Sequence, residues 1–163
     1  KVTGEKSDDV FEESFKFVLP GYNVRPLEMS GALGIEQLKK LPSFIEIRRD
    51  NAKLFQSLFA DHPFIDIQKE TGASSWFGFS LILKENAPYS RAELVKKLMD
   101  NGIECRPIVT GNFLKNTSVL EYFDYEVSGT LDASEYLDEH GLFVGNHQND
   151  IKDNIKALRD LLA

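Results

Sequence analysis

Residues 75–83 read SWFGFSLIL, a stretch dominated by aromatic and aliphatic side chains. Such side chains pack well on a pleated surface and are typical of the central strand of a sheet. The segments FIDI (64–67) and GLFVG (141–145) also have the character of short strands. A further strand is expected over IECRPIV (103–109), where Pro107 interrupts the run. The sequence therefore predicts a small sheet organised around residues 75–83.

Two helices are expected before the first of these strands. The apolar spacing predicts one over residues 27–41. Pro42 suits the first turn of a second helix over 42–60, because the N–H that proline lacks has no partner in a first turn. Gly31 and Gly34 lie on the apolar face of the first helix. Glycine costs roughly 1 kcal/mol against alanine inside a helix, so two on one face indicate that another backbone approaches closely.

The remaining helices complete the fold class. Ser90 and Glu93 are spaced as a capping box that starts a helix, and Asn101-Gly102 supplies its left-handed stop. Further helices are expected over residues 117–123, 132–139 and 151–162. Helices and strands are mixed without a sustained strand–helix–strand repeat. We therefore predict an α+β fold, in which a small, mostly antiparallel sheet has helices packed on one face.

Composition narrows the class of protein. The 163 residues are 42% hydrophobic and carry a formal net charge of −7, which argues against general binding to nucleic acid or to anionic membranes. No apolar run approaches the roughly 18 residues of a membrane span, and no signal peptide is visible. A single cysteine, Cys105, excludes an internal disulfide and a multi-cysteine zinc site, and cytoplasmic localisation is expected. Residues 1–14 are polar and predict a mobile lead-in to a domain over 15–163.

Polar side chains gather at four places that could carry function. These are Asn23 with Arg25, Arg106, the TGNFLKN segment with Asn112, and the GNHQND segment with Asn146 and His147. Each also has a structural interpretation, because asparagines at such junctions commonly cap helices or form turns. No nucleophile–base pair, phosphate-binding glycine loop or metal-ligand spacing is recognisable. The residues alone therefore indicate a soluble domain whose polar loops suit an anion or a sugar.

Three motifs in order resemble a known family. They are Gly21-Tyr22-Asn23 with Arg25, then RPIVTGNFLKN (106–116), then GLFVGNH (141–147). Together with a Gln37–Leu41 run, they resemble the DegT/DnrJ/EryC1/StrS family of fold-type I, pyridoxal-phosphate-dependent sugar enzymes. The likeness runs from about residue 15 to the end of the chain. It is closest to the branch that dehydrates a GDP-linked 4-keto-6-deoxy-mannose at C3, in the synthesis of colitose for lipopolysaccharide O-antigen.

The resemblance implies a cofactor and a set of partners. Pyridoxal 5′-phosphate, with its pyridoxamine form, would be bound mainly by a large domain that this chain lacks, so no catalytic residue is expected here. The family is dimeric, and Asn23 and Arg25 are expected to reach the cofactor phosphate of the partner subunit. The substrates would be a nucleotide-linked 4-keto-6-deoxy sugar and glutamate as amino donor. No metal is expected, and neither nucleic acid nor a membrane is an expected partner.

The resemblance also assigns candidate contacts to the substrate. Arg106, Asn112, Asn146 and His147 are the candidate sugar-binding residues, and we expect them to face one cleft toward the missing domain. Two alternatives stay open. The parent could be an aminotransferase of 4-keto sugars, because the lysine or histidine that separates the two reactions lies outside this chain. The chain could also be a free-standing sugar-nucleotide-binding or interaction module. As an isolated piece it is expected to be inactive.

Overall fold

The structure is a computed structural model, and it describes Asp8, Asp9, Phe11, Gly21 and residues 27–163. Most of the lead-in predicted over residues 1–14 lies outside this part of the chain. The helices and strands, in chain order, are α2 (Glu28–Phe59), β1 (Ile65–Ile67), β2 (Gly78–Leu83), α3 (Arg91–Asp100), β3 (Cys105–Arg106), the 3-10 helix η1 (Phe113–Lys115), α4 (Thr117–Leu120), α5 (Asp132–His140), β4 (Gly141–Gly145) and α6 (Lys152–Leu161).

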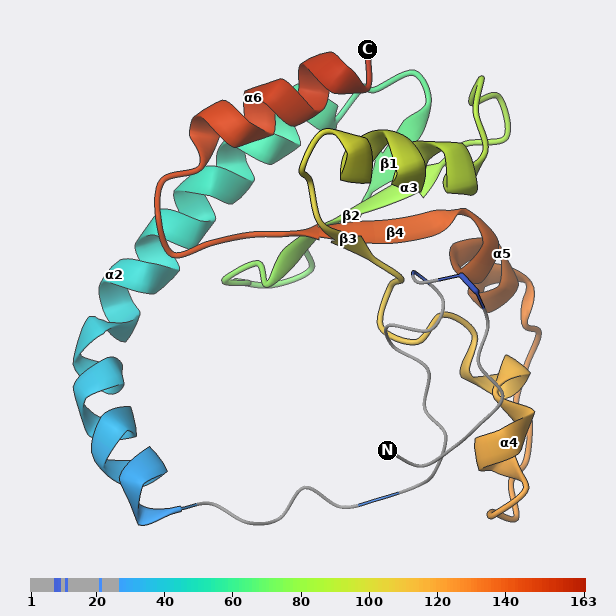
Figure 1. The fold of residues 1–163 in the computed structure, drawn as a ribbon, viewed down its shortest axis with the longest axis horizontal. Coiled ribbons are helices and arrows are strands. Elements are labelled where there is room, and N and C mark those ends of the chain that lie inside the picture. Colours follow the sequence, from blue (N-terminus) through green and yellow to red (C-terminus); the bar gives the residue numbers. More distant parts are fainter. Residues whose placement is uncertain (1–7, 10, 12–20, 22–26) are drawn as a thin grey trace.

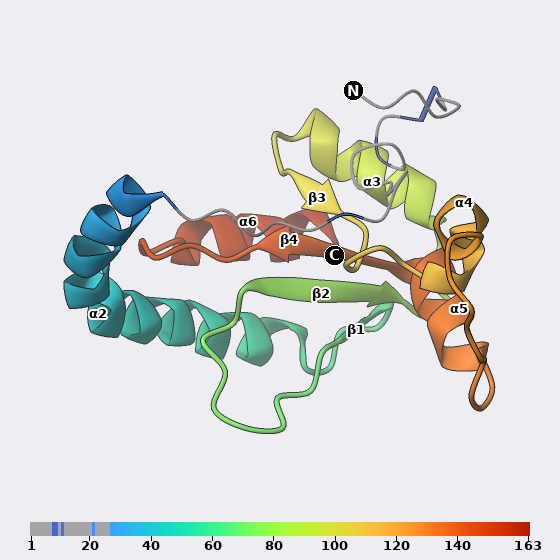
Figure 2. The same ribbon diagram turned by 90° about the horizontal axis from the view of Figure 1, so that it is seen from below.

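The four strands form one antiparallel sheet in the order β1-β2-β4-β3 (Figure 2). Side chains alternate between the two faces of a strand, so directly paired residues share a face. Phe79 pairs with Val144 on the face that we call the core face. Ser80 and Arg106 both pair with Phe143 on the opposite face, which we call the outer face. The predicted antiparallel sheet with β2 at its centre is confirmed.

Helices α2, α3 and α6 cover the core face, and α6 lies along the second half of α2 (Figure 1). The ring of Phe55 on α2 stacks on Phe79 of the sheet at 4.3 Å and on Phe59 at 4.7 Å. All three rings are buried, so the core is built around an aromatic stack. Helices on one face were predicted and are confirmed. Helix α5 additionally packs beside the sheet, where the Tyr136 hydroxyl donates to Leu83 O at 2.8 Å.

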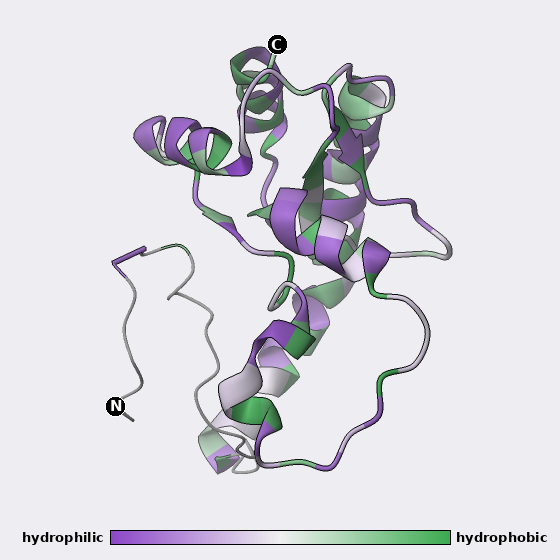
Figure 3. Ribbon diagram, turned by 90° about the vertical axis from the view of Figure 1, so that its right-hand side faces the viewer, coloured by the Kyte–Doolittle hydropathy of each residue, from purple (hydrophilic) through white to green (hydrophobic). Residues whose placement is uncertain are grey.

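The prediction of two helices separated at Pro42 is wrong, because α2 runs unbroken through that residue. A proline inside a helix leaves the carbonyl four residues earlier without its bond, here that of Leu38. Residues 27–43 are exposed, so water can reach the freed carbonyl, and the Ser43 hydroxyl donates to Lys40 O at 2.8 Å. Hydrophobic residues recur along this projecting half of α2 (Figure 3). No described atom outside the helix itself lies within 4 Å of a Cβ built on Gly31 or Gly34, so none of the described segments approaches these glycines closely.

Two predicted strands are shorter than expected, for related reasons. Trp76 has a φ of 52°, and its buried side chain turns into the core, so β2 begins only at Gly78. Pro107 cannot donate to the sheet, and Val109 has a φ of 55°, so β3 ends at Arg106. Both positive-φ residues carry side chains, which makes these conformations costly.

The helix-end signals are confirmed, while the middle of the chain differs from expectation. Ser90 and Glu93 form the complete capping box of α3, and Gly102 adopts a φ of 73° after it. The helix expected over 117–123 is the single turn α4, and η1 was not predicted. Within the described residues, no helix is long and apolar enough to cross a membrane.

Candidate functional site

The outer face of the sheet carries a hollow beside Arg106, which we call the arginine hollow. It has a volume of about 520 Å³ and mainly apolar walls. Its lining residues are Gln68, Ser74, Trp76, Phe77, Gly78, Ser80, Arg106, Ile108, Val109, Thr110 and Phe143. A smaller hollow of about 190 Å³ shares Phe77, Arg106 and Phe143 with it and extends to Arg48 and Glu104. The two hollows thus form one surface that holds two guanidinium groups.

Two aromatic rings and two loops form the walls of the arginine hollow. Phe77, which is 72% exposed, lies 6.0 Å from Phe143, centroid to centroid. A Cβ on Gly78 would come within 2.8 Å of the Phe143 ring, so glycine there allows that ring to lie over β2. Val109 is 75% exposed on the opposite wall. The positive-φ residues Trp76 and Val109 both line this hollow, and backbone strain tends to gather at functional sites.

Arg106 reaches the outer face from the end of β3. Its Nε and Nη2 donate to Glu104 Oε1 at 3.0 and 2.7 Å, and 42% of its side chain is exposed. An exposed ion pair of this kind contributes only about 0–1 kcal/mol. A substrate phosphate or carboxylate can therefore compete with Glu104, and a guanidinium matches such an anion with two parallel donors. Arg106 thus lines both hollows with a partly exposed guanidinium.

Asn146 lies at the junction of α2 and the sheet and is 6% exposed. Its Nδ2 donates to Arg48 O and to Trp76 O, both at 3.0 Å. Its Oδ1 accepts from the backbone N of His147 at 2.8 Å and from Asn51 Nδ2 at 3.2 Å. These bonds use both ends of the side-chain amide, so Asn146 has a structural role at this junction, and it also lines the smaller hollow.

The polar junction contains two residues that the sequence reasoning missed, Arg48 and Asn51. Asn51 is fully buried, and its Nδ2 also lies 3.2 Å from His147 O and 2.9 Å from Asn149 O. Arg48 Nη2 donates to Asn146 O at 3.1 Å. One signal was available in the sequence. Asn51 stands four residues from Ile47 and four from Phe55 on the apolar stripe of its helix, where a polar residue needs a buried partner.

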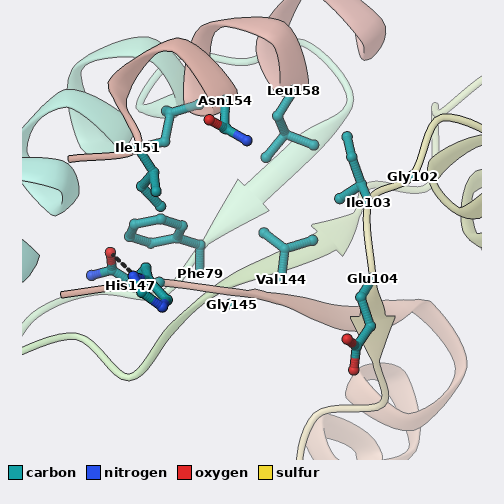
Figure 4. Close-up of a pocket in the computed structure, with 12 residues that line it drawn as sticks. Phe79, Gly102, Ile103, Glu104, Val144, Gly145, His147, Ile151, Asn154 and Leu158 are labelled. Atoms are coloured by element: carbon teal, nitrogen blue, oxygen red, sulfur yellow. Dashed lines mark hydrogen bonds between the residues drawn. The ribbon is translucent and has the colours of Figure 1, made fainter. Parts of the chain in front are cut away.

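His147 lines a different hollow of about 330 Å³, which opens between α6 and the sheet (Figure 4). Its Nδ1 accepts from the backbone N of Asn149 at 3.1 Å, and its side chain is exposed. In Figure 4 His147 lies at one end of this hollow and Glu104 at the other, with Phe79 and Val144 between them. His147 is therefore available to a ligand, and its hollow shares Glu104, Gly145 and Asn146 with the smaller hollow beside Arg106.

Asn112 lies in the loop after β3 and is 6% exposed. Its side chain accepts from Leu114 N at 3.1 Å and caps η1, while its backbone N donates to Asp138 Oδ1 at 2.9 Å. Arg106 and Asn146 thus line the smaller hollow, Asn146 and His147 line the hollow beside α6, and Asn112 lines neither. The expectation that all four face one cleft is wrong for Asn112, whose side chain caps η1, whereas Asn146 lies where the hollows that hold Arg106 and His147 adjoin.

The remaining candidates can be stated briefly. Asn23 and Arg25 lie outside the described residues. Among residues 27–163 and the few described before them, no group of three or more side chains is arranged to hold a metal ion. Burial, assisted by the nearby Glu104 carboxylate, raises the pKa of Cys105 to about 11, so its thiol stays protonated near neutral pH. Cys105 is therefore a core residue and a poor nucleophile.

Comparison with known proteins identifies the class to which this fold and these motifs belong. The model of the DegT/DnrJ/EryC1/StrS aminotransferase family matches residues 1–156. The chain belongs to this family.

Particular relatives are much closer than the family as a whole. The GDP-4-keto-6-deoxy-D-mannose 3-dehydratase of Yersinia pseudotuberculosis is 71% identical over 161 residues, which are 99% of this chain and 41% of that protein. A solved GDP-4-keto-6-deoxymannose-3-dehydratase with a trapped PLP–glutamate geminal diamine is 67% identical with a TM-score of 0.83. A variant of the same enzyme with bound GDP-perosamine matches equally well, and the chain covers 42% of each of these two structures. The chain thus spans about two fifths of the length of its relatives.

Proposed function

We propose that this chain is the C-terminal part of a pyridoxal-phosphate-dependent enzyme that removes the 3-hydroxyl group of GDP-4-keto-6-deoxy-mannose. The observation that carries the proposal is the 71% identity to a 3-dehydratase over 99% of the chain. Because the match covers 99% of the chain, it includes both the RPIVTGNFLKN and the GLFVGNH motifs. The enzyme would act in the cytoplasm, in the synthesis of lipopolysaccharide sugars.

The arginine hollow would receive an anionic part of a substrate. A relative binds a GDP-linked sugar and another holds a glutamate adduct, so phosphate and carboxylate groups both occur among the relatives' ligands. Arg106 offers a partly exposed guanidinium against an apolar wall, which suits either group. His147 would contact the substrate from the neighbouring hollow. Asn112 and Asn146 would shape the site through the backbone groups that they bind.

The donors in this chain fit the phosphate of the cofactor. Pyridoxal phosphate, when bound, supplies an electron sink for removal of the sugar hydroxyl. The amide of Asn23 and the guanidinium of Arg25 are N–H donors, and such donors match a phosphate group. We propose that both reach the cofactor phosphate of a second subunit in a homodimer. The residues that hold the cofactor ring and move the proton would lie in the large domain.

The test is product analysis with the full-length protein. Incubated with GDP-4-keto-6-deoxy-mannose, pyridoxal phosphate and glutamate, it should yield a 3-deoxy sugar, detected as loss of the C3 hydroxyl in the NMR spectrum. A 4-amino sugar as the main product would instead establish the aminotransferase alternative. The 163-residue chain alone should show no cofactor absorbance band and no turnover. A full-length protein that bound the nucleotide sugar without any reaction would contradict the proposal.

A further inference from the structure

We infer that Asp138 is a positioning residue that holds the loop after β3 as a preformed wall of the arginine hollow. The loop runs from Ile108 to Asn116, and three of its residues, Ile108, Val109 and Thr110, line the hollow. Asp138 itself lies near the end of α5, about one helical turn before β4 begins. It is not a lining residue of the hollow, so any effect on a substrate must act through the loop.

The Asp138 carboxylate contacts the loop with both oxygens. Oδ1 accepts from the backbone N of Asn112 at 2.9 Å, and Oδ2 lies 2.7 Å from Lys115 Nζ. The hydrogen bond and charge of Asp138 raise the pKa of Lys115, in keeping with this pairing. The carboxylate is 24% exposed, so it is only partly hydrated. These two contacts, three residues apart in the loop, hold it on α5.

The shape of the loop is adapted to this carboxylate. Gly111 has a φ of +66°, and a Cβ added there would lie 1.8 Å from Asp138 Oδ1. Glycine is therefore required twice, by the backbone conformation and by the approach of the carboxylate. The Gly111 N donates to Ile108 O at 2.9 Å, which closes the turn that carries Val109 at its positive φ. An anchor on α5 explains how a β-branched residue is kept in that conformation.

The anchor itself is braced from the rest of the fold. Arg91 at the start of α3 donates to the backbone O of Asp138. Gly141, just after α5, has no room for a Cβ, because Leu137 O and Ile108 Cδ1 lie within 2.4 and 2.7 Å of that position. Ile108 thus packs against the end of α5 on one side of the loop while Asp138 binds it on the other. The wall of the hollow is therefore built before any ligand arrives.

The kinetic part of this inference rests on the proposed function. If the hollow receives the substrate, loosening its wall should weaken binding of the sugar nucleotide more than it slows the chemical step. Asp138 variants should therefore raise KM and leave kcat nearly unchanged. The structural part, the fixing of the loop, is independent of any activity.

Three variants separate the roles of Asp138. Asp138→Ala removes both contacts, Asp138→Asn keeps an oxygen acceptor for Asn112 N, and Lys115→Ala removes only the ion pair. Asp153→Ala is the matched control, because it breaks the comparable 3.0 Å pair with Lys156 on α6, away from the hollow. Hydrogen exchange of the amides in residues 109–116 and steady-state kinetics of the full-length protein are measured for each.

We expect Asp138→Ala to speed exchange of the Asn112 amide by about tenfold or more and to raise KM for the sugar nucleotide about tenfold. Asp138→Asn should restore most of the slow exchange and most of the low KM. Lys115→Ala and Asp153→Ala should have exchange rates and KM values close to those of the unmodified protein. Gly111→Ala should reproduce the exchange result with Asp138 still in place, because its Cβ would displace the carboxylate, and this variant covers the case in which Asp138→Ala folds poorly.

Unchanged exchange in Asp138→Ala, or equal exchange in Asp138→Ala and Asp153→Ala, would overturn the anchoring role. Faster exchange with an unchanged KM, or a loss confined to kcat, would overturn the role in shaping the hollow. A full-length protein that exchanges as expected but has no activity on the sugar nucleotide would instead refute the proposed function and leave the anchor standing.

Discussion

The two faces of the sheet are organised in opposite ways. The core face is closed by the stack of Phe55 on Phe79, and both rings are buried. The outer face is open, with Phe77 72% exposed beside Arg106 and two residues held at positive φ. The core face therefore carries the stability of the chain, and the outer face carries strain and unburied apolar surface. This difference indicates which face is free to serve a ligand.

The largest expected effect is on the core face. Phe55→Ala removes a fully buried ring from between Phe79 and Phe59 and should lower the free energy of unfolding by about 3–5 kcal/mol. Urea denaturation of the chain measures the change. Phe77→Ala is the control on the outer face, and it should change stability by less than about 0.5 kcal/mol. If Phe55→Ala and Phe77→Ala lowered the free energy of unfolding equally, the proposed difference between the two faces would be contradicted.

Arg106→Ala should affect function and leave stability alone. Under the proposed function, it should lower kcat/KM of the full-length enzyme. The loss should be equivalent to about 2–4 kcal/mol of transition-state stabilisation, because a charged contact to the substrate is lost. Its melting temperature should stay within a degree or two of the unmodified protein, since its ion pair with Glu104 is exposed. Arg159→Ala, on α6, is a matched control that should leave kcat/KM unchanged. A loss of stability without a kinetic effect would make Arg106 a structural residue.

Asn146 lies on the boundary between the two faces and tests which side it serves. Asn146→Ala leaves the Arg48 and Trp76 carbonyls with fewer donors, so the free energy of unfolding should fall by about 1–3 kcal/mol. Asn149→Ala, at an exposed site in the same loop, should have little effect on urea denaturation. If Asn146→Ala unfolds at the same urea concentration as the unmodified protein but binds the substrate more weakly, a direct contact of Asn146 with the sugar is favoured over a purely structural role.

The smallest expected effect is a pH dependence of the core. His62 is 2% exposed, and burial, helped by the positive charge of Arg159, lowers its pKa from 6.5. The unfolded chain therefore binds the proton more readily, so stability is complete above about pH 6.5 and declines as the pH falls below it. His62→Phe should flatten this decline in denaturation curves measured between pH 7 and pH 5. If the contribution of His62 to the free energy of unfolding increased as the pH fell, the assignment of a lowered pKa to His62 would be contradicted.

The fold was largely predictable because its main signals are local. The aromatic and branched residues of 78–83 select a strand. The Ser90–Glu93 box marks the start of α3, and Gly102 marks its end. The candidate site was predictable only in part. The motif containing Arg106 pointed to the outer face, but the same reasoning grouped Asn112 and Asn146 with it. Asn112 caps a turn two residues on, whereas Asn146 binds Arg48, Asn51 and Trp76, which are distant in the sequence.

The sequence by itself determined the element types, the central strand and the family, since each depends on periodicity or on motifs of a few residues. Tertiary structure alone decided three other features. Pro42 stays within α2 because its surroundings are exposed and water can reach the freed carbonyl. Trp76 leaves the strand because its ring fills the core. Asn146 becomes structural because Asn51, 95 positions earlier, is brought within 3.2 Å of it. Burial and long-range partners exist only once the chain has folded, and they set the cost of every polar group.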